Sequence, residues 1–295
     1  MAKHAAHAKV QQSTGGFANS LLTVLIVLLF AGGAAFALYP VYSNLYYEYV
    51  NARAALEYES TVKAIDQDMV AEALAAAHRY NEAHRENVVV DPFDEKVKAA
   101  DPDYEKLLNL TGDGVMGYIE IPKIGVKLVV YHGTTAEVLD KGVGHVQGTS
   151  LPVGGQRTHS VLSGHRGLPS AKLFTDLDQV GNGDVFVFHV LGEALAYEVD
   201  RTQVVKPEEV GMLAIQEGRD LMTLVTCTPY GVNTHRMVVT GHRVDYVAPE
   251  VDTPVVKLAQ ISPQALAIAG VMSLLVLIAL VMFTRYLVGK GGSGR

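Results

Sequence analysis

The sequence predicts a mainly β domain, a closed barrel or a sandwich, with helices on its N-terminal side and a membrane-spanning segment at each end. Seven or eight short β-rich segments, separated by turn residues, lie between residues 114 and 248. A stretch rich in Ala and Glu, without Pro or Gly, precedes them at 42–86. Uncharged apolar runs at 21–38 and 265–283 have nearly the length that crosses a hydrocarbon core of about 30 Å.

Positive charges near the two ends indicate how the chain lies across a membrane. Lys3 and Lys9 precede the first apolar run, and Arg285, Lys290 and Arg295 follow the second. The positive-inside rule then places both termini in the cytoplasm and the central domain outside the cell. We interpret the first run as an uncleaved anchor. A signal peptide is the alternative, because residues 35–37 (Ala-Phe-Ala) resemble a small-residue cleavage site.

The segment before the β-rich region divides into a helical part and a loop. Over 40–86, apolar residues recur roughly at helical spacing, which predicts one or two amphipathic helices with a bend near Asp66. Residues 87–113 contain two Asp-Pro turn signals, at Asp91 and Asp101, and little periodicity. We expect a long ordered loop there, of the kind that often forms a lid or a binding segment.

The β-rich region is resolved into strands by its alternation and its turns. The expected strands are 118–121, 126–131, 160–164, 185–190, 195–199, 202–205, a segment ending at Cys227, and 236–244. A short helix is expected at 173–177. If the last two strands form a hairpin, Cys227 and Arg236 lie side by side next to its connecting loop.

Three side chains are candidates for chemistry: His165, Cys227 and Arg236. Cys227 is the only cysteine, so it forms no internal disulfide and is either a buried structural thiol or a reactive one. A neighbouring cation stabilises a thiolate, an imidazole carries protons, and a guanidinium stabilises an oxyanion. This combination is typical of nucleophilic acyl transfer.

Plainer interpretations of the same residues remain open from spacing alone. A lone cysteine at a strand end is more often a core residue, and His165 is one of 11 histidines. A membrane-tethered surface scaffold with an inert Cys227 is therefore an alternative. The scattered histidines and the single cysteine form no metal-ligand cluster, so we expect no metal and no cofactor. A net charge of −7 without a basic stripe disfavours nucleic acid as a partner.

Two motifs resemble a known family. The segment Thr223-Leu224-Val225-Thr226-Cys227-Thr228-Pro229, with Arg236 nine residues after the cysteine, is similar to the active-site segment of sortases. The segment Ser163-Gly164-His165-Arg166-Gly167 resembles their histidine motif, and the order His, Cys, Arg agrees. The resemblance covers about residues 114–247. It implies an eight-stranded closed β-barrel and a membrane-anchored cysteine transpeptidase of Gram-positive bacteria, with Cys227, His165 and Arg236 as its catalytic residues.

Two further features resemble class C, the sortases that polymerise pilins. One is the apolar run after the catalytic domain. The other is Asp91-Pro92-Phe93, which is similar to the Asp-Pro-aromatic lid motif of that class, with Phe where Trp or Tyr is frequent. The resemblance implies that Asp91 approaches Arg236 and that Phe93 covers Cys227, where a ring–sulfur contact contributes about 1 kcal/mol.

The resemblance also implies a reaction and a set of partners. Cys227 attacks an LPXTG-like sorting signal between Thr and Gly, and the resulting acyl group passes to a pilin lysine as an isopeptide bond. A sortase that anchors proteins to peptidoglycan is the alternative enzyme. The expected organisation is a cytoplasmic tail (1–20), a transmembrane helix or signal peptide (21–39), a helical annex (40–86), a lid loop (87–113), a catalytic barrel (114–248), a linker (249–264), a transmembrane helix (265–287) and a second tail (288–295).

Overall fold

The computed structural model describes residues 15–85, 91, 93, 103–168, 170–246, 270, 273, 278 and 281. The chain forms two compact units, one of residues Val41–Ser262 and one of Met1–Pro40 with Pro263–Arg295. The expected linker at 249–264, the second tail at 288–295 and most of the expected helix at 265–287 lie outside the described residues.

Helix α1 (Gly15–Ala64) begins within the expected first tail and contains the whole first apolar run together with part of the annex. Among the residues that the structure describes, no helix combines the length and hydropathy needed to span a bilayer.

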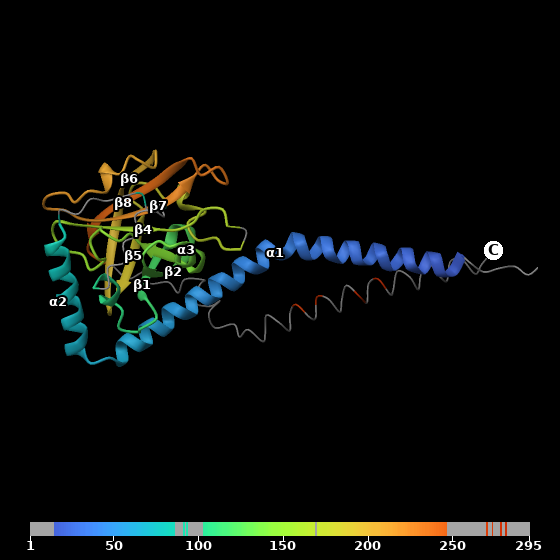
Figure 1. The fold of residues 1–295 in the computed structure, drawn as a ribbon, viewed down its shortest axis with the longest axis horizontal. Helices are drawn as coiled ribbons and strands as arrows, with labels where there is room; N and C mark the ends of the chain where they lie inside the picture. Colours follow the sequence, from blue (N-terminus) through green and yellow to red (C-terminus); the bar gives the residue numbers. More distant parts are fainter. Residues whose placement is uncertain are drawn as a thin grey trace, which may run out of the picture. The chain divides into compact units, whose positions relative to one another are not determined.

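The β-rich region folds into a closed barrel of eight strands, which confirms the predicted barrel and its preceding helices (Figure 1). The strands are β1 (Val115–Ile121), β2 (Val126–His132), β3 (Val143–His145), β4 (Thr158–Ser163), β5 (Val185–Val190), β6 (Glu193–Val205), β7 (Asp220–Thr228) and β8 (His235–Val244). Around the barrel their order is β1-β2-β3-β4-β7-β8-β6-β5. Closure leaves none of these strands as an unpaired edge.

Two pairings determine where the functional side chains lie. Strands β4 and β7 are parallel neighbours although 56 residues separate Ser163 from Asp220 at the nearest ends. Strands β7 and β8 are antiparallel neighbours and form the expected hairpin. The ends of β4 and β7 and the start of β8 therefore meet at one rim of the barrel.

Several short elements differ from the prediction. The expected strands 195–199 and 202–205 are one strand, β6, because a register shift between Val199 and Arg201 accommodates Asp200 as a bulge. The three-residue strand β3 is too short to give an alternation signal. The expected helix at 173–177 is wrong: that segment is turn followed by the 3₁₀ turn η4 (Leu177–Gln179). The other 3₁₀ turns are η2 (Tyr104–Lys106), η3 (Pro122–Ile124) and η5 (Gly211–Leu213).

A short helix, α3 (Ala136–Lys141), lies between β2 and β3, where the sequence pattern predicts no element. Thr135 caps its first turn by accepting a hydrogen bond from the backbone N–H of Val138. The helix provides the crossover that lets β3 run parallel to β2.

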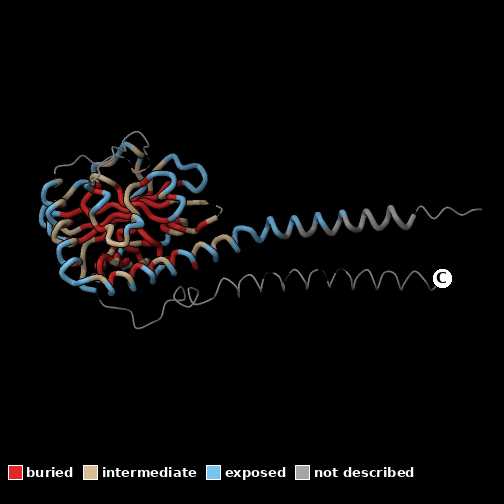
Figure 2. Tube along the Cα trace, turned by 60° about the horizontal axis from the view of Figure 1, so that its bottom comes forward, coloured by how far each residue is buried: buried red, intermediate tan, exposed pale blue. Residues whose placement is uncertain are grey.

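The barrel is filled by large apolar side chains, and buried residues concentrate there in Figure 2. Fully buried examples include Met116, Ile119, Leu162, Phe186, Phe188 and Leu224. The core also extends under the helices, because Tyr58 and Val62 of α1 and Ala77 of α2 join the same cluster. Burial of this area is the main stabilising contribution to the rigid rim.

The helical annex is attached to the barrel by buried polar contacts. Tyr58 of α1 donates to the Met116 carbonyl and accepts from the Leu191 N–H, both at 3.0 Å. Helix α2 (Gln67–Ala83) begins after its N-cap Asp66, close to the predicted bend. Its Asn81 exchanges two hydrogen bonds with the backbone of Leu151. These bonds orient the helices in a way that apolar packing alone does not.

Candidate active site

The β7–β8 hairpin holds Cys227 beside Arg236. The two residues are paired across the strands, and Arg236 Nη1 lies 3.6 Å from Cys227 Sγ. Only 8 % of Cys227 is exposed, because eight residues of β7 after Asp220 are buried on both faces. A rigid hairpin thus presents a sulfur and a cation with little freedom to separate.

His165 reaches the same rim from the end of β4. The β4–β7 register pairs Ser163 with Val225, so two further residues along both chains bring His165 level with Cys227. The pairing continues beyond β4, since the Gly164 N–H donates to the Val225 carbonyl at 3.1 Å. Thr226 Oγ1 also donates to the Gly164 carbonyl at 2.7 Å. Backbone and side-chain hydrogen bonds together fix the position of His165 relative to Cys227 at the rim.

Arg166 joins the histidine loop to the cysteine strand, a role that its sequence position alone does not predict. Its Nη1 donates to Thr228 Oγ1 at 2.9 Å, and its Nε donates to the Thr175 carbonyl at 3.1 Å. Its Nη2 lies 2.5 Å from Asp178 Oδ2. Thr228 directly follows Cys227, so this mostly buried guanidinium connects the segment that carries His165 with the segment that carries Cys227. The only sequence signal was its position next to His165 in the glycine-flanked motif.

Asp91 occupies the remaining donors of Arg236. The carboxylate accepts from Arg236 Nε at 2.9 Å and from Nη2 at 2.7 Å, which is a bidentate pair. Both side chains are largely shielded, with 12 % and 15 % of Arg236 and Asp91 exposed. The structure therefore shows the approach that the lid motif implied.

Phe93 lies between the cation and the imidazole. Its ring centroid is 4.9 Å from Arg236 Cζ and 6.1 Å from the centroid of His165. The first contact has cation–π geometry, which contributes about 0.5–1 kcal/mol at a partly exposed site. The expected ring–sulfur contact with Cys227 stays a prediction. We refer to Asp91 and Phe93 together as the lid residues.

Burial and nearby charges determine the protonation of the thiol and the imidazole. Burial raises the pKa of the Cys227 thiol; Arg236 lowers it and Asp91 raises it further, so that the net shift is upward. Burial lowers the pKa of His165, and the opposing effect of Asp140 does not restore it. With the lid residues in place, both groups are uncharged near neutral pH.

A buried apolar cluster adjoins Cys227 and Arg236 on the outer face of the sheet. Strand alternation places Val225 and Val238 on the same face as Cys227 and Arg236. A buried cluster forms there: Val146, Val161, Leu213, Val225 and Val238, with Phe93, Val205, Val210 and Met212 packed against it. We call this cluster the apolar shelf. It is separate from the main barrel core and adjoins the lid residue Phe93.

A buried histidine fixes the segment that overhangs the apolar shelf. His159 Nδ1 lies 2.9 Å from the Ala214 carbonyl, and its Nε2 lies 2.7 Å from Thr223 Oγ1. Burial lowers the pKa of His159, so the ring is neutral and donates from Nδ1 while accepting at Nε2. This histidine is structural, as is His145, whose pKa burial lowers to about 4.

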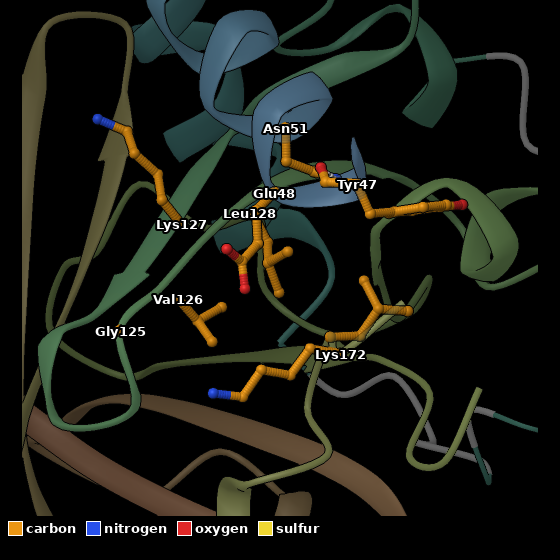
Figure 3. A pocket seen from close by; sticks show the side chains of 9 residues that line it. Tyr47, Glu48, Asn51, Gly125, Val126, Lys127, Leu128 and Lys172 are labelled. Carbon is orange, nitrogen blue, oxygen red and sulfur yellow. Dashed lines mark hydrogen bonds between the residues drawn. The ribbon is translucent and has the colours of Figure 1, made fainter. Parts of the chain in front are cut away.

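Two hollows in the described part of the chain are lined by residues other than the predicted site residues. One of about 20 Å³ lies between α1 and β2, with Glu48 and Lys172 among its lining side chains (Figure 3). That volume suits about one water molecule rather than a peptide. A second, of about 480 Å³, is lined by Glu82, Ala83, Arg85, Arg157, Ile215 and Glu217. In the part of the chain that the structure describes, no three His, Cys, Asp or Glu side chains are grouped to hold a metal ion.

The fold and the rim geometry define a cysteine peptidase or acyl transferase, since a thiol, an imidazole and a guanidinium meet on a rigid wall. A family model described as the sortase domain matches residues 119–244. Sortase D of Bacillus subtilis is 30% identical over 131 residues, which cover 43% of this chain and 63% of that protein. Sortase A of Staphylococcus aureus is 35% identical over 124 residues, which cover 41% of this chain and 58% of that protein. The matches thus span less than two thirds of these two relatives.

Solved structures match over a greater part of their length. Sortase C-1 of Actinomyces oris is 48% identical, with a TM-score of 0.57, and the match covers 60% of this chain and 99% of that one. Sortase C of Streptococcus pneumoniae is 41% identical, with a TM-score of 0.63, and the match covers 66% and 98%. Sortase C1 of Streptococcus agalactiae is 44% identical, with a TM-score of 0.61, and the match covers 66% and 100%. The chain belongs to the sortase family of cysteine transpeptidases.

Proposed function

We propose that this chain is a class C sortase, which cleaves an LPXTG-like sorting signal between Thr and Gly and joins pilin subunits through a lysine isopeptide bond. Two of its structural neighbours support the pilin substrate. The S. pneumoniae structure is described with reference to pilin substrate specificity, and one from group B Streptococcus is described as a pilus-related sortase C.

The observation that carries the proposal is the double engagement of Arg236. One edge of its guanidinium faces Cys227 Sγ, and two other donors hold Asp91. A substrate carbonyl that becomes an oxyanion beside Cys227 needs those same donors. The lid residues therefore occupy the place of substrate, and the reaction begins when they leave it.

In the proposed reaction, the first half forms a thioester. As Cys227 attacks the Thr carbonyl carbon, the thiol loses its proton to the neutral imidazole of His165. Arg236 donates hydrogen bonds to the carbonyl oxygen while that oxygen carries negative charge. The C–N bond to Gly then breaks, and His165 returns the proton to the departing amine. Departure of Asp91 lowers the pKa of Cys227 and so favours the first step.

The apolar shelf is the part of the site that we propose contacts an extended signal peptide. It adjoins Cys227 along β7 and is lined by branched aliphatic side chains. The apolar Leu and Pro of a sorting signal lie upstream of its Thr, so they would contact the shelf while the Thr carbonyl reaches the sulfur. Phe93 packs on the same shelf in the closed form and would be displaced by those residues.

We also propose that the enzyme is anchored in the cell membrane, with both termini in the cytoplasm and the barrel on the outer surface of a Gram-positive cell. The support is the sequence pattern: two uncharged apolar runs, each flanked on its terminal side by Lys or Arg. A pilin polymerase needs this arrangement, because its substrates are exported proteins.

The nucleophile is tested with the full-length chain in detergent, an LPXTG peptide and a lysine-bearing acceptor. The unaltered protein should form a thioester, seen as an added acyl mass on Cys227, and then an isopeptide product. Cys227→Ala should form neither, whereas Thr234→Ala, in the loop between β7 and β8, should form both. Product formed by purified Cys227→Ala would refute the assignment of Cys227 as the nucleophile. Transfer to peptidoglycan amines but not to lysine would favour the anchoring type of sortase instead.

The lid is tested by removing its two contacts separately. Asp91→Ala and Phe93→Ala should each raise the rate of peptide cleavage by roughly 5-fold, the ratio that corresponds to about 1 kcal/mol of lost lid contact. Asp103→Ala is the matched control, because that carboxylate is exposed and pairs with Lys106 instead. Unchanged or slower cleavage by both lid variants, with thermal unfolding unaltered, would remove the lid interpretation.

A further inference from the structure

Asp140, at the end of α3, places a carboxylate beside the catalytic imidazole. Its Oδ1 lies 3.8 Å from His165 Nε2, and 68 % of its side chain is exposed. Its position is fixed from a second direction, since the Tyr47 hydroxyl of α1 donates to the Asp140 backbone carbonyl. Figure 3 shows the Tyr47 ring extending away from the small hollow between α1 and β2.

The contact is not that of a carboxylate that orients a catalytic histidine. Such a group is usually buried and within about 2.6–3.2 Å of the ring nitrogen. A gap of 3.8 Å is too long for that bond, and the exposed oxygens of Asp140 remain accessible from solvent. The geometry suits a third group that arrives from solvent and contacts both residues.

In the described part of the chain Asp140 pairs with no lysine or arginine, unlike two other acidic side chains. Glu137, on the same helix, pairs with Lys141 at 2.6 Å, and Asp176 pairs with Lys172 at 2.8 Å. Among the described residues, the one basic group within ion-pair distance of Asp140 is His165, whose pKa is lowered so that the ring is neutral. Asp140 therefore presents negative charge next to an imidazole that is ready to accept a proton.

We propose that Asp140 is the docking carboxylate for the acceptor amine, and that it holds the lysine ammonium at the Nε2 edge of His165. This inference rests on the proposed transpeptidase function and identifies where its second substrate enters. The ammonium gives one proton to His165 Nε2, and the amine nitrogen forms a bond to the thioester carbon. The C–S bond then breaks, and the second proton passes from nitrogen to the Cys227 sulfur. Asp140 itself neither gains nor loses a proton.

The proposal is tested by comparing a charged and an uncharged acceptor on the full-length chain. The charged acceptor is Nα-acetyl-lysine amide, and the uncharged one is hydroxylamine, which is neutral at pH 7. Asp140→Asn should raise the KM for the lysine derivative about 2- to 5-fold, as expected for loss of one exposed ion pair. Its KM for hydroxylamine should match that of the unaltered protein, and thioester formation shows that the variant is folded.

The matched control is Glu137→Gln, which removes the same charge from the same helix but away from His165. It should leave the KM for both acceptors unchanged. Two results would overturn the proposal: an equal loss of transfer to both acceptors in Asp140→Asn, which would mean that Asp140 acts on His165, or no change for either. Failure of the unaltered chain to form a thioester would instead refute the proposed function and this inference with it.

Discussion

The Cys227 thiol is held in its neutral form while the lid residues are in place. Burial is the largest influence on its pKa and favours the neutral form, and the Asp91 carboxylate acts in the same direction. Arg236 opposes both, but its charge is shared with Asp91 through two hydrogen bonds. The same carboxylate thus occupies two donors of Arg236 and disfavours the thiolate.

Replacing Asp91 should therefore change how fast the thiol reacts at a given pH. In Asp91→Asn, loss of the negative charge stabilises the thiolate, so the midpoint of the pH profile for iodoacetamide alkylation should move to lower pH. Easier access alone would raise the rate at high pH without moving the midpoint, so the full profile separates the two effects. Asp103→Asn should keep the original midpoint. An unmoved midpoint in Asp91→Asn would contradict the electrostatic interpretation.

The proposed site residues differ in how far the sequence alone could identify them. The proximity of Cys227 and Arg236 follows from a hairpin with a short loop, so alternation and turn residues were sufficient. The position of His165 depends on a parallel pairing between β4 and β7, which no local pattern indicates, and only the family resemblance selected it among 11 histidines. Asp140 and Arg166 act through contacts between distant segments, which spacing does not reveal.

At the scale of elements, a buried charged cluster joins helix α1 to the barrel. Lys127 of β2 lies 2.8 Å from Glu120 of β1 and 3.9 Å from Glu59 of α1, and only 7 % of its side chain is exposed. His189 of β5 lies 3.6 Å from Glu120 and stacks on Tyr118. Lys127 therefore links α1, β1 and β2, and Glu120 links this group to β5 through His189. Because the lysine and the carboxylates are shielded from water, their charges are stabilised mainly by one another.

This cluster predicts acid sensitivity. Burial raises the pKa of Glu120, but Lys127 and His189 outweigh it and bring the pKa to about 2, below its unfolded value of about 4.3. Its contribution to the free energy of unfolding is thus complete above about pH 4.3 and is lost as the pH falls toward 2. In urea titrations, the free energy of unfolding of Glu120→Gln should fall by about 2 kcal/mol less than that of the unaltered chain between about pH 4.3 and pH 2. Glu193→Gln, at an exposed position, should retain the original dependence; equal slopes in all three proteins would contradict the assignment.

Strands and helices were predictable where their patterns were long. The strands of the β7–β8 hairpin and the break near Asp66 follow from alternation and from capping chemistry. The three-residue strand β3 exists because its neighbours β2 and β4 pair with it, and helix α3 exists because a parallel pair needs a crossover. Both elements depend on pairing between strands that are distant in the sequence, so local sequence patterns could not predict them.

At the scale of the whole molecule, the two compact units divide at a proline. Helix α1 runs through Pro40, and the boundary between the units falls between Pro40 and Val41. Proline has no backbone N–H, so the helix lacks one of its internal hydrogen bonds at that point. The site residues all belong to the unit that begins at Val41.

The proposed topology makes a prediction for intact cells. With an affinity tag at each end of the chain, added protease should degrade the barrel in protoplasts but leave both tags protected, because the termini are proposed to be cytoplasmic. Lysed protoplasts are the control, in which both tags should be lost. Loss of the N-terminal tag during export, with the barrel intact, would indicate that residues 21–39 are cleaved as a signal peptide.

The pairing of Asp91 with Arg236 also has a consequence for competition. Because Asp91 belongs to the same polypeptide, it faces Arg236 at an effective local concentration on the order of millimolar, whatever the protein concentration. A dilute free peptide must compete with this tethered carboxylate for Arg236. If the enzyme is anchored as proposed, a sorting signal confined to the same membrane would itself be present at high local concentration. The enzyme would then select substrates by their location in the same membrane as well as by their sequence. Soluble proteins that contain a similar motif would not be cleaved efficiently.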